Sequence, residues 1–238
     1  MQTPATTRRA NQTAAQQTCV SIESVSRIYG SFAALRNVTA AIPSGAVTVI
    51  LGENGAGKST LLRLIAGLIA PTRGSVTVFG SNPRHQRGRI AYMSHASMLY
   101  DELTAMENLR YFAALHRDKG CACVGSPEMA LRAVGLDPAL TRPVGQYSQG
   151  MRQRASLARV LQTDPQLLLL DEPFSNLDAS SCQHMIELLA DFRTWPVSNG
   201  GSRTVILTTH QRALAEPLAD ILLTMRQGQI IERAGAAA

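Results

Sequence analysis

Apolar residues between positions 19 and 51 fall in short runs that are separated by turn residues. CVSIESV, NVTAAI and VTVIL have the length and β-branched content of strands, and PSG predicts a turn between the last two. LLRLIAGLI has the spacing of a helix that ends near Gly67, with Pro71 beyond it. SVTVFG and RIAYMS predict two more strands. The first part of the chain is therefore expected to be β-structure around one helix.

Helical spacing dominates from about residue 101 to residue 162. The predicted helices are ELTAMENLRYFAALHR, SPEMALRAVGL and QGMRQRASLARVLQ, with Gly- and Pro-containing joints between them. PQLLLLDEP and RTVILTTH are apolar throughout, as buried parallel strands are, and LDASSCQHMIELLADF predicts a helix between them. ILLTMRQGQIIE predicts a hairpin that turns at Gln227-Gly228. The sequence thus predicts an α/β core with an inserted α-helical subdomain.

Both ends of the chain lack this patterning. Residues 1–18 are rich in Thr, Gln and Ala, and residues 233–238 end in AGAAA, so both are expected to be disordered tails. No apolar segment follows the Arg pair near the start, which argues against a secretory leader. No stretch nears the roughly 20 apolar residues of a membrane-spanning helix. We therefore expect a cytoplasmic protein whose folded part spans residues 19–232.

Composition narrows the choice of partners. The net charge of +6 would permit contact with nucleic acid or an anionic membrane. The arginines are scattered, however, and aromatic residues make up only 5% of the chain, which is poor for stacking single strands, so no nucleic-acid partner is expected. Cys19, Cys121, Cys123 and Cys182 lack the spacing of a redox or zinc motif and are expected to be reduced thiols.

The stretch GENGAGKST follows the apolar run VTVIL directly and matches the phosphate-binding loop pattern. Glycines let the backbone wind around a phosphate chain, and the helix that follows adds its positive end. Lys58 is expected to reach the β- and γ-phosphates and Ser59 to hold Mg²⁺. A Gly-rich turn without a ligand is the alternative. The predicted nucleotide-binding residues of the loop are Gly52, Glu53, Asn54, Gly55, Ala56, Gly57, Lys58, Ser59 and Thr60.

Two adjacent carboxylates end the apolar run LLLLDEP. The carboxyl edge of an open α/β sheet is where ligands bind. Asp171 is expected to meet Mg²⁺ through its water shell, and Glu172 to orient and deprotonate the attacking water. The pair alone could simply end a strand, but the loop before it makes a nucleotide site the better interpretation.

Three further stretches identify a family. YSQGMRQR spans residues 147–154, FSNLD spans residues 174–178 and TTH spans residues 208–210. Together with the loop and LLLLDEP, their order resembles that of the ATP-binding-cassette (ABC) ATPases over residues 19–232. The resemblance implies a P-loop NTPase core with a mixed sheet, an antiparallel N-terminal β part and an inserted helical subdomain. It also implies ATP and Mg²⁺ as cofactors, a second copy as dimer partner and separate transmembrane permease subunits. No N-K-x-D motif of GTPases is present.

The resemblance also assigns roles to single residues. Ser148, Gln149 and Gly150 occupy the signature, which contacts the γ-phosphate of ATP held by a second chain. Asp178 occupies the D-loop, which communicates across the dimer. His210 takes the place of the switch histidine, which contacts the γ-phosphate. Tyr29 stands where the family stacks an aromatic ring on adenine, although a lone tyrosine is also common at a strand end.

Two positions depart from the family pattern. The signature reads YSQGM in place of LSGGQ, with Gln149 and Met151 at the altered positions. YSQGM-type signatures resemble those of export ATPases. His95 takes the place of a glutamine that contacts Mg²⁺ and water and links to the membrane partner. An imidazole offers fewer hydrogen-bonding options than an amide, so an uncoupled surface histidine is the alternative.

The segment around His95 suggests a subgroup. SHASMLYDELTAMENLRYF and TTHQ resemble the ATP-binding subunit of the haem exporter of cytochrome c maturation. Met98, Leu99 and Tyr100 lie where the family docks its membrane partner, or they simply pack beneath the helical subdomain. An export ATPase for a drug, lipid or polysaccharide stays open, as does a non-transport ABC protein acting on nucleic acid or ribosomes. The latter usually carries two modules or a coiled-coil insertion, and neither is present. In the transport case the protein is expected at the cytoplasmic face of the cell membrane.

Overall fold

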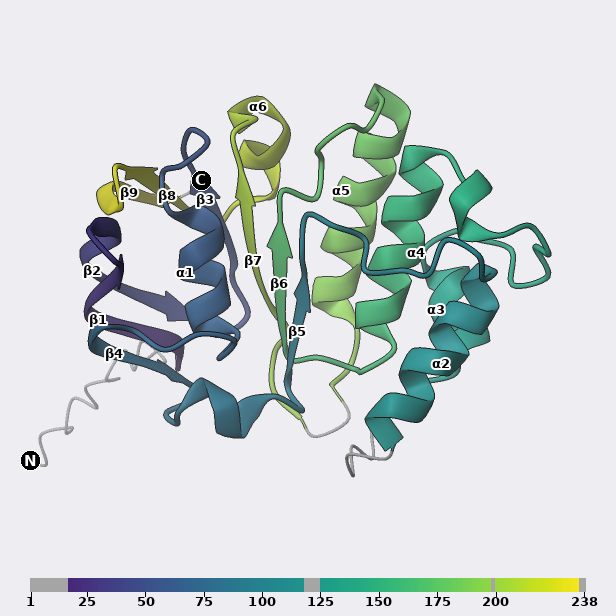
Figure 1. Cartoon of the computed structure of the whole chain (residues 1–238), viewed down its shortest axis with the longest axis horizontal. Helices are drawn as coiled ribbons and strands as arrows, with labels where there is room; N and C mark the ends of the chain where they lie inside the picture. Colours follow the sequence, from purple (N-terminus) through teal and green to yellow (C-terminus); the bar gives the residue numbers. More distant parts are fainter. Residues whose placement is uncertain (1–16, 118–124, 198–199, 236–238) are drawn as a thin grey trace, which may run out of the picture.

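The computed structural model describes residues 17–117, 125–197 and 200–235. Within these residues the strands form two sheets, with helix α1 packed between them (Figure 1). An antiparallel sheet has the order β2-β1-β4, and a mixed sheet has the order β5-β6-β7-β3-β8-β9. The strand bounds are β1 Thr18–Tyr29, β2 Phe32–Pro43, β3 Val47–Leu51, β4 Arg73–Val78, β5 Ile90–Met93, β6 Leu167–Asp171, β7 Thr204–Thr209, β8 Ile221–Arg226 and β9 Gln229–Gly235.

Helices α2 to α5 cover the face of the mixed sheet that lies opposite α1 (Figure 1). The helix bounds are α1 Lys58–Ile65, α2 Ala105–Arg117, α3 Pro127–Ala133, α4 Gln149–Leu161, α5 Ala179–Thr194 and α6 Arg212–Ala215, with 3₁₀ turns at Pro83–Gln86, Val144–Gln146 and Glu216–Leu218. The expected α/β fold is confirmed: an antiparallel N-terminal β part, a mixed sheet and a set of helices between β5 and β6.

The apolar strands of the mixed sheet are buried on both faces. In β6, Leu167 and Leu169 pack with α1 and the antiparallel sheet, whereas Leu168 and Leu170 pack with the helices on the other side. All four side chains are fully buried, and each contributes about 1.5–3 kcal/mol of hydrophobic stabilisation. This two-sided burial explains why the strand is a continuous apolar run. It also brings the residues after β3, β6 and β7 to one edge of the sheet, because these strands run parallel.

The chain turns sharply between β8 and β9. Gln227 and Gly228 have φ angles of 50° and 79°, as in a two-residue hairpin turn with two left-handed residues, so the predicted turn is confirmed. A Cβ atom at Gly228 would lie 2.7 Å from the carbonyl oxygen of Ala34 in β2. Only glycine therefore fits where this hairpin meets the antiparallel sheet.

Helix α2 has a capping box at its start. The Thr104 hydroxyl accepts a hydrogen bond from the Glu107 N–H at 3.1 Å, and the Thr104 N–H donates to the Glu107 carboxylate at 2.8 Å. The Thr104 N–H and hydroxyl both donate to the Glu107 carboxylate, and these two hydrogen bonds lower the pKa of Glu107. Asn108 is fully buried and accepts from the Tyr100 N–H at 2.8 Å while its amide donates to the Tyr100 carbonyl at 3.0 Å. The sequence TAMEN thus forms the start of helix α2, and Asn108 hydrogen-bonds the preceding segment at Tyr100 to this helix.

Two expected tails need correction at their inner ends. β1 begins at Thr18, where the Thr18–Pro43 pair opens the antiparallel ladder, so the strand starts one residue inside the first predicted tail. β9 extends to Gly235, paired with Ile221, so residues 233–235 belong to a strand. Gln17 is described and its carbonyl accepts from the Ser44 N–H at 2.7 Å, whereas residues 1–16 and 236–238 lie outside the described residues, as do Cys121 and Cys123.

Candidate nucleotide site

The loop between β3 and α1 is shaped by close backbone approaches. A Cβ atom at Gly52 would lie 2.5 Å from the Met225 carbonyl oxygen, and one at Gly57 would lie 2.6 Å from the Ala34 carbonyl oxygen. Gly57 also has a φ of 100° and caps α1. Neither position has room for a side chain, so the glycines keep the loop tight against β2 and β8. The first N–H groups of α1 have no partner within the helix, so this end of α1 favours an anion.

Lys58 is buried at the start of α1, with 5% of its surface exposed. Its ammonium group donates to the carbonyl oxygens of Gly52 at 2.7 Å and Glu53 at 3.1 Å. It also forms an ion pair with Glu172, with 3.1 Å between Nζ and Oε1. Within the described residues Oε1 accepts no hydrogen bond, so this contact is an ion pair whose angle is not that of a hydrogen bond. A buried ammonium group thus bridges the loop and the end of β6.

Asp171 is buried at the end of β6, with 2% of its surface exposed. Three hydroxyl groups from different elements donate to its carboxylate. Ser59 and Thr208 donate to Oδ1 at 2.9 Å and 2.8 Å, and Tyr92 donates to Oδ2 at 3.2 Å. A buried carboxylate is costly unless its oxygens are satisfied, and here both oxygens are.

Glu172 follows Asp171 with a left-handed backbone, at a φ of 52°. Its N–H donates to the Thr208 hydroxyl at 3.1 Å and the Thr208 carbonyl at 3.2 Å, which holds this unfavourable conformation in place. Its Oε2 atom lies 3.1 Å from Nδ1 of His210, just beyond β7. The structure thus brings together Lys58, Glu172 and His210, which lie far apart in the sequence.

The signature and D-loop residues lie at two other helix starts. Ser148 caps α4 and accepts from the Met151 N–H at 3.2 Å, whereas Asp178 caps α5 and accepts from the Ser181 N–H at 2.7 Å. This backbone hydrogen bond lowers the pKa of Asp178. Gly150 packs on the Ser181 side chain so closely that a Cβ atom would clash. Ser148, Gln149 and Asp178 are exposed, and none of them bonds to the carboxylate pair among the described residues.

Tyr29 and His95 are placed at the surface. Tyr29 ends β1, is 43% exposed and has the Arg27 guanidinium 4.5 Å from its ring centroid. His95 is exposed in a bend after β5 and makes no hydrogen bond or ion pair within the described residues. The structure therefore does not join His95 to the Lys58–Glu172–His210 group within this chain.

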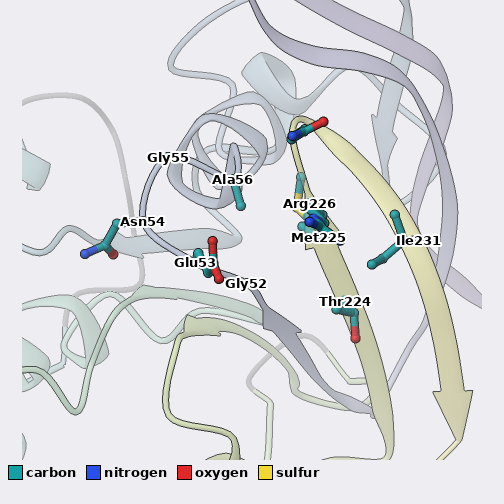
Figure 2. A pocket seen from close by; sticks show the side chains of 10 residues that line it. Gly52, Glu53, Asn54, Gly55, Ala56, Thr224, Met225, Arg226 and Ile231 are labelled. Carbon is teal, nitrogen blue, oxygen red and sulfur yellow. The ribbon is translucent and has the colours of Figure 1, made fainter.

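A pocket of about 520 Å³ adjoins the loop on the side away from the carboxylates. Figure 2 shows it between the loop that carries Asn54 and Ala56 and the β8–β9 hairpin that carries Thr224 and Ile231. Its lining includes neither Lys58 nor the carboxylate pair. It therefore flanks the candidate site without containing its charged groups.

Sequence reasoning named Thr208 only as part of the stretch TTH, without a role of its own, and did not single out Tyr92. Thr208 lies two residues before His210, and the strand period of two would have placed both side chains on one side. Tyr92 carries no such signal, because its contact with Asp171 depends on β5 lying beside β6. The sequences of β5 and β6 do not indicate that these two strands are neighbours in the sheet.

Comparison with known proteins identifies the family. The family model described as "ABC transporter" matches residues 35–175, from β2 to just beyond Glu172. The chain belongs to the ABC transporter ATP-binding family. Among its relatives, ABC transporter ATP-binding protein NatA of Bacillus subtilis is 34% identical over 85% of the chain and 81% of NatA. The sulfate/thiosulfate import ATP-binding protein CysA of Mycolicibacterium paratuberculosis is 36% identical over 89% of the chain, which spans only 58% of that protein.

Solved structures show the same fold for this ABC chain. The ATP-binding cassette MJ0796, in a dimeric post-hydrolysis state with ADP and Pi, superposes with a TM-score of 0.78 at 24% identity over 92% of the chain and 99% of MJ0796. An ATP-binding subunit of an ABC transporter superposes with a TM-score of 0.74 at 28% identity over 92% of the chain and 90% of that subunit. Among the described residues of the ABC chain, none of the helices has both the length and the apolar character to cross a bilayer.

Proposed function

We propose that the chain is the ATP-hydrolysing subunit of an ABC transporter, working at the cytoplasmic face of a membrane with separate permease subunits. The carrying observation is the convergence of Lys58 from the loop with Glu172 after β6 and His210 after β7. The loop supplies phosphate-binding N–H groups, and the two strand ends supply an acid–base pair. The family match supports the same assignment.

ATP binding would engage the loop through Gly52 to Thr60. Lys58 would exchange the carbonyl oxygens of Gly52 and Glu53 for the β- and γ-phosphates, because a phosphate oxygen is the stronger acceptor for an ammonium group. Tyr29 offers adenine one ring face, while Arg27 lies on the ring.

The residues present fit Mg²⁺. Ser59 and Asp171 offer only oxygen atoms, 2.9 Å apart, and Mg²⁺ usually takes one or two carboxylates together with phosphates and water. When bound, the ion would neutralise charge on the β- and γ-phosphates. Ser59 would turn its hydroxyl oxygen from Asp171 toward the metal, and Asp171 would hold the water shell.

Glu172 is proposed as the general base. Its carboxylate would accept a proton from the attacking water, and His210 would hold both the γ-phosphate and the carboxylate in position. The 3.1 Å contact between His210 Nδ1 and Glu172 Oε2 already sets their relative orientation. General base catalysis of this kind contributes about 10²–10⁴ in rate.

The composite site would need a second copy. Ser148, Gln149, Gly150 and Asp178 lie at helix starts, which favour anions, yet they do not reach the chain's own carboxylate pair. A homodimer would bring the signature of one chain to the nucleotide of the other. MJ0796, whose fold this chain shares, has been solved as a dimer.

A permease would dock beside His95. Met98 is 62% exposed with a φ of 55°, and Tyr100 is 47% exposed with its ring edge-on to Tyr111 at 5.2 Å. Such a cluster of exposed aromatic residues suits a protein partner. If His95 replaces the family glutamine, His95→Ala should uncouple hydrolysis from transport with little effect on ATP binding, whereas His95→Gln should be tolerated. Equal coupling in the Ala variant would contradict this role.

Direction and cargo are proposed from separate observations. Export of haem for cytochrome c maturation is supported by the stretches SHASMLYDELTAMENL and TTHQ. The capping box and buried Asn108 account for TAMEN by local structure, which leaves His95 and TTHQ as the supporting positions. CysA relatives are named as importers, and this favours import as the second candidate.

Deletion of the gene and complementation separates these functions. The haem hypothesis expects loss of haem-stained c-type cytochromes in the deletion strain, restoration by the parental gene and no restoration by Glu172→Gln. Normal c-type cytochromes in the deletion strain would reject haem export. Failure of the same strain to grow on sulfate as sole sulfur source, with growth restored by cysteine, would support import. Co-purification with ribosomes or DNA, in place of a polytopic membrane protein, would refute the transport function itself.

A further inference from the structure

Tyr92 belongs to none of the motifs that point to the nucleotide site, yet its side chain reaches the carboxylate of Asp171. The hydroxyl donates to Oδ2 at 3.2 Å. Within the described residues this is the one hydrogen bond to Oδ2, whereas Oδ1 accepts from both Ser59 and Thr208. The two oxygens of Asp171 are therefore held by different elements, and β5 holds one of them alone.

The sheet register explains why a tyrosine is needed at this position. Tyr92 pairs with Leu169 of β6, and Asp171 lies two residues after Leu169. The side chains of Tyr92 and Asp171 therefore project from the same face of the sheet, the face that packs against α1. Diagonal neighbours in a sheet lie roughly 7–8 Å apart, within reach of an aromatic side chain. A serine or threonine at this position would be too short to reach the carboxylate.

The Tyr92 hydroxyl is the donor in this pair, because an ionised carboxylate only accepts. Arg63 lies in the last turn of α1, and its interaction with the Tyr92 hydroxyl raises the pKa of Arg63. Without the Tyr92 hydroxyl, Oδ2 would have no hydrogen-bond partner within the described residues, and the carboxylate would be free to rotate, since its terminal torsion is soft.

We propose that Tyr92 is a positioning residue for Asp171: its hydroxyl holds Oδ2 so that Oδ1 stays directed at Ser59, and the affinity of the site for Mg²⁺ depends on it. The inference rests on the proposed metal role of Ser59 and Asp171. Hydrogen-bond partners of metal-binding carboxylates typically change metal affinity by about 10–100-fold when removed. Because β5 leads directly to His95, Tyr92 also connects the proposed permease-facing segment, residues 95–100, to the proposed metal site.

Tyr92→Phe tests the proposal, because it removes one oxygen atom and keeps the ring packed. The full chain would be titrated with Mn²⁺ in the presence of a non-hydrolysable ATP analogue, with free Mn²⁺ read by electron paramagnetic resonance. The affinity of the analogue alone would be measured in EDTA. We expect Mn²⁺ affinity to fall about tenfold, with analogue affinity in EDTA unchanged. Ser75→Ala is the matched control, since it removes a hydroxyl that donates to the exposed carboxylate of Glu23 at 3.2 Å.

The outcomes separate the possible failures. Parental Mn²⁺ affinity in Tyr92→Phe would overturn the positioning role while leaving the metal site in place. An equal loss of analogue affinity in EDTA would also overturn it, because Tyr92 would then support the fold of the loop. If the parental chain binds no Mn²⁺ beyond that of the analogue itself, the metal role of Ser59 and Asp171 fails, and the proposal fails with it. Loss of affinity in Ser75→Ala would attribute the effect to general destabilisation and overturn the proposal.

Discussion

Replacement of Glu172 by glutamine separates two effects that the structure combines in one side chain. Glutamine keeps the shape of the side chain, and its amide can still meet His210 at the 3.1 Å position of Oε2. It cannot accept the proton of the attacking water. Hydrolysis of ATP should therefore fall by roughly 10² or more, the usual contribution of a general base.

The same substitution should strengthen ATP binding. In the parental chain Lys58 is shared between two loop carbonyls and the Glu172 carboxylate, which lies 3.1 Å from Nζ. ATP must draw Lys58 away from that carboxylate. A hydrogen bond to a charged group is worth about 1.5–3 kcal/mol, and the lower end, about 1.5 kcal/mol, applies here because this contact lacks the hydrogen-bond angle. Its removal corresponds to roughly tenfold tighter ATP binding.

Single-turnover hydrolysis and calorimetric titration with ATP would measure the two effects. Glu187→Gln is the control, because it removes one negative charge from an exposed position on α5. Parental hydrolysis by Glu172→Gln would show that Glu172 is not the base. Weaker ATP binding by the variant would refute the competition between Glu172 and the phosphates for Lys58.

Three other perturbations test neighbouring parts of the structure. Lys58→Ala should weaken ATP binding by at least tenfold in calorimetry and lower the melting temperature, because it leaves the half-buried Glu172 carboxylate without its cation; unchanged affinity would reject the loop assignment. Ser148→Arg should block ATP-driven dimerisation in light scattering while the monomer still binds ATP, with Ser148→Ala as the control for loss of the α4 cap. Hydrogen bonds, chiefly from Ser126, lower the pKa of Glu128 to about 2, so its stabilisation is complete above about pH 4.5 and is lost as the pH falls toward 2. Ser126→Ala should therefore lower the melting temperature at pH 7, and a difference that persists at pH 2 would contradict this assignment.

The local sequence was sufficient to predict those elements whose structure depends mainly on their own residues. The apolar run VTVIL, the glycines of GENGAGKST and the helix that follows are β3, the loop and α1, because packing and backbone freedom both act within these residues. The Gln227–Gly228 turn was predictable for the same reason. Asp171 and Glu172 could be placed at a strand end from LLLLDEP alone.

Contacts between residues that are far apart in the sequence could not be predicted from the local sequence. Tyr92 meets Asp171 only because β5 lies beside β6, and Thr208 bridges the carboxylate pair only because β7 lies on the other side of β6. When parallel strands are joined by long crossovers, the sequence of a strand does not indicate which strands lie beside it in the sheet. The expected C-terminal tail was wrong at residues 233–235 for a similar reason, since pairing with β8 keeps this weakly patterned segment in the sheet.

The charged groups of the site hold one another before any ligand is considered. Lys58, Glu172 and His210 form a chain of contacts at 3.1 Å, and three hydroxyl groups satisfy Asp171. ATP would have to replace the contacts that Lys58 already makes. The affinity for ATP would therefore depend on how much more stable the new phosphate contacts are than the contacts they replace. Ser148, Gln149 and Asp178 are exposed at their helix starts and have no part in this network within the described residues. In the proposed mechanism, ATP binding and the first rearrangement of Lys58 would involve one chain, whereas closure around the γ-phosphate would require the exposed helix starts of a second.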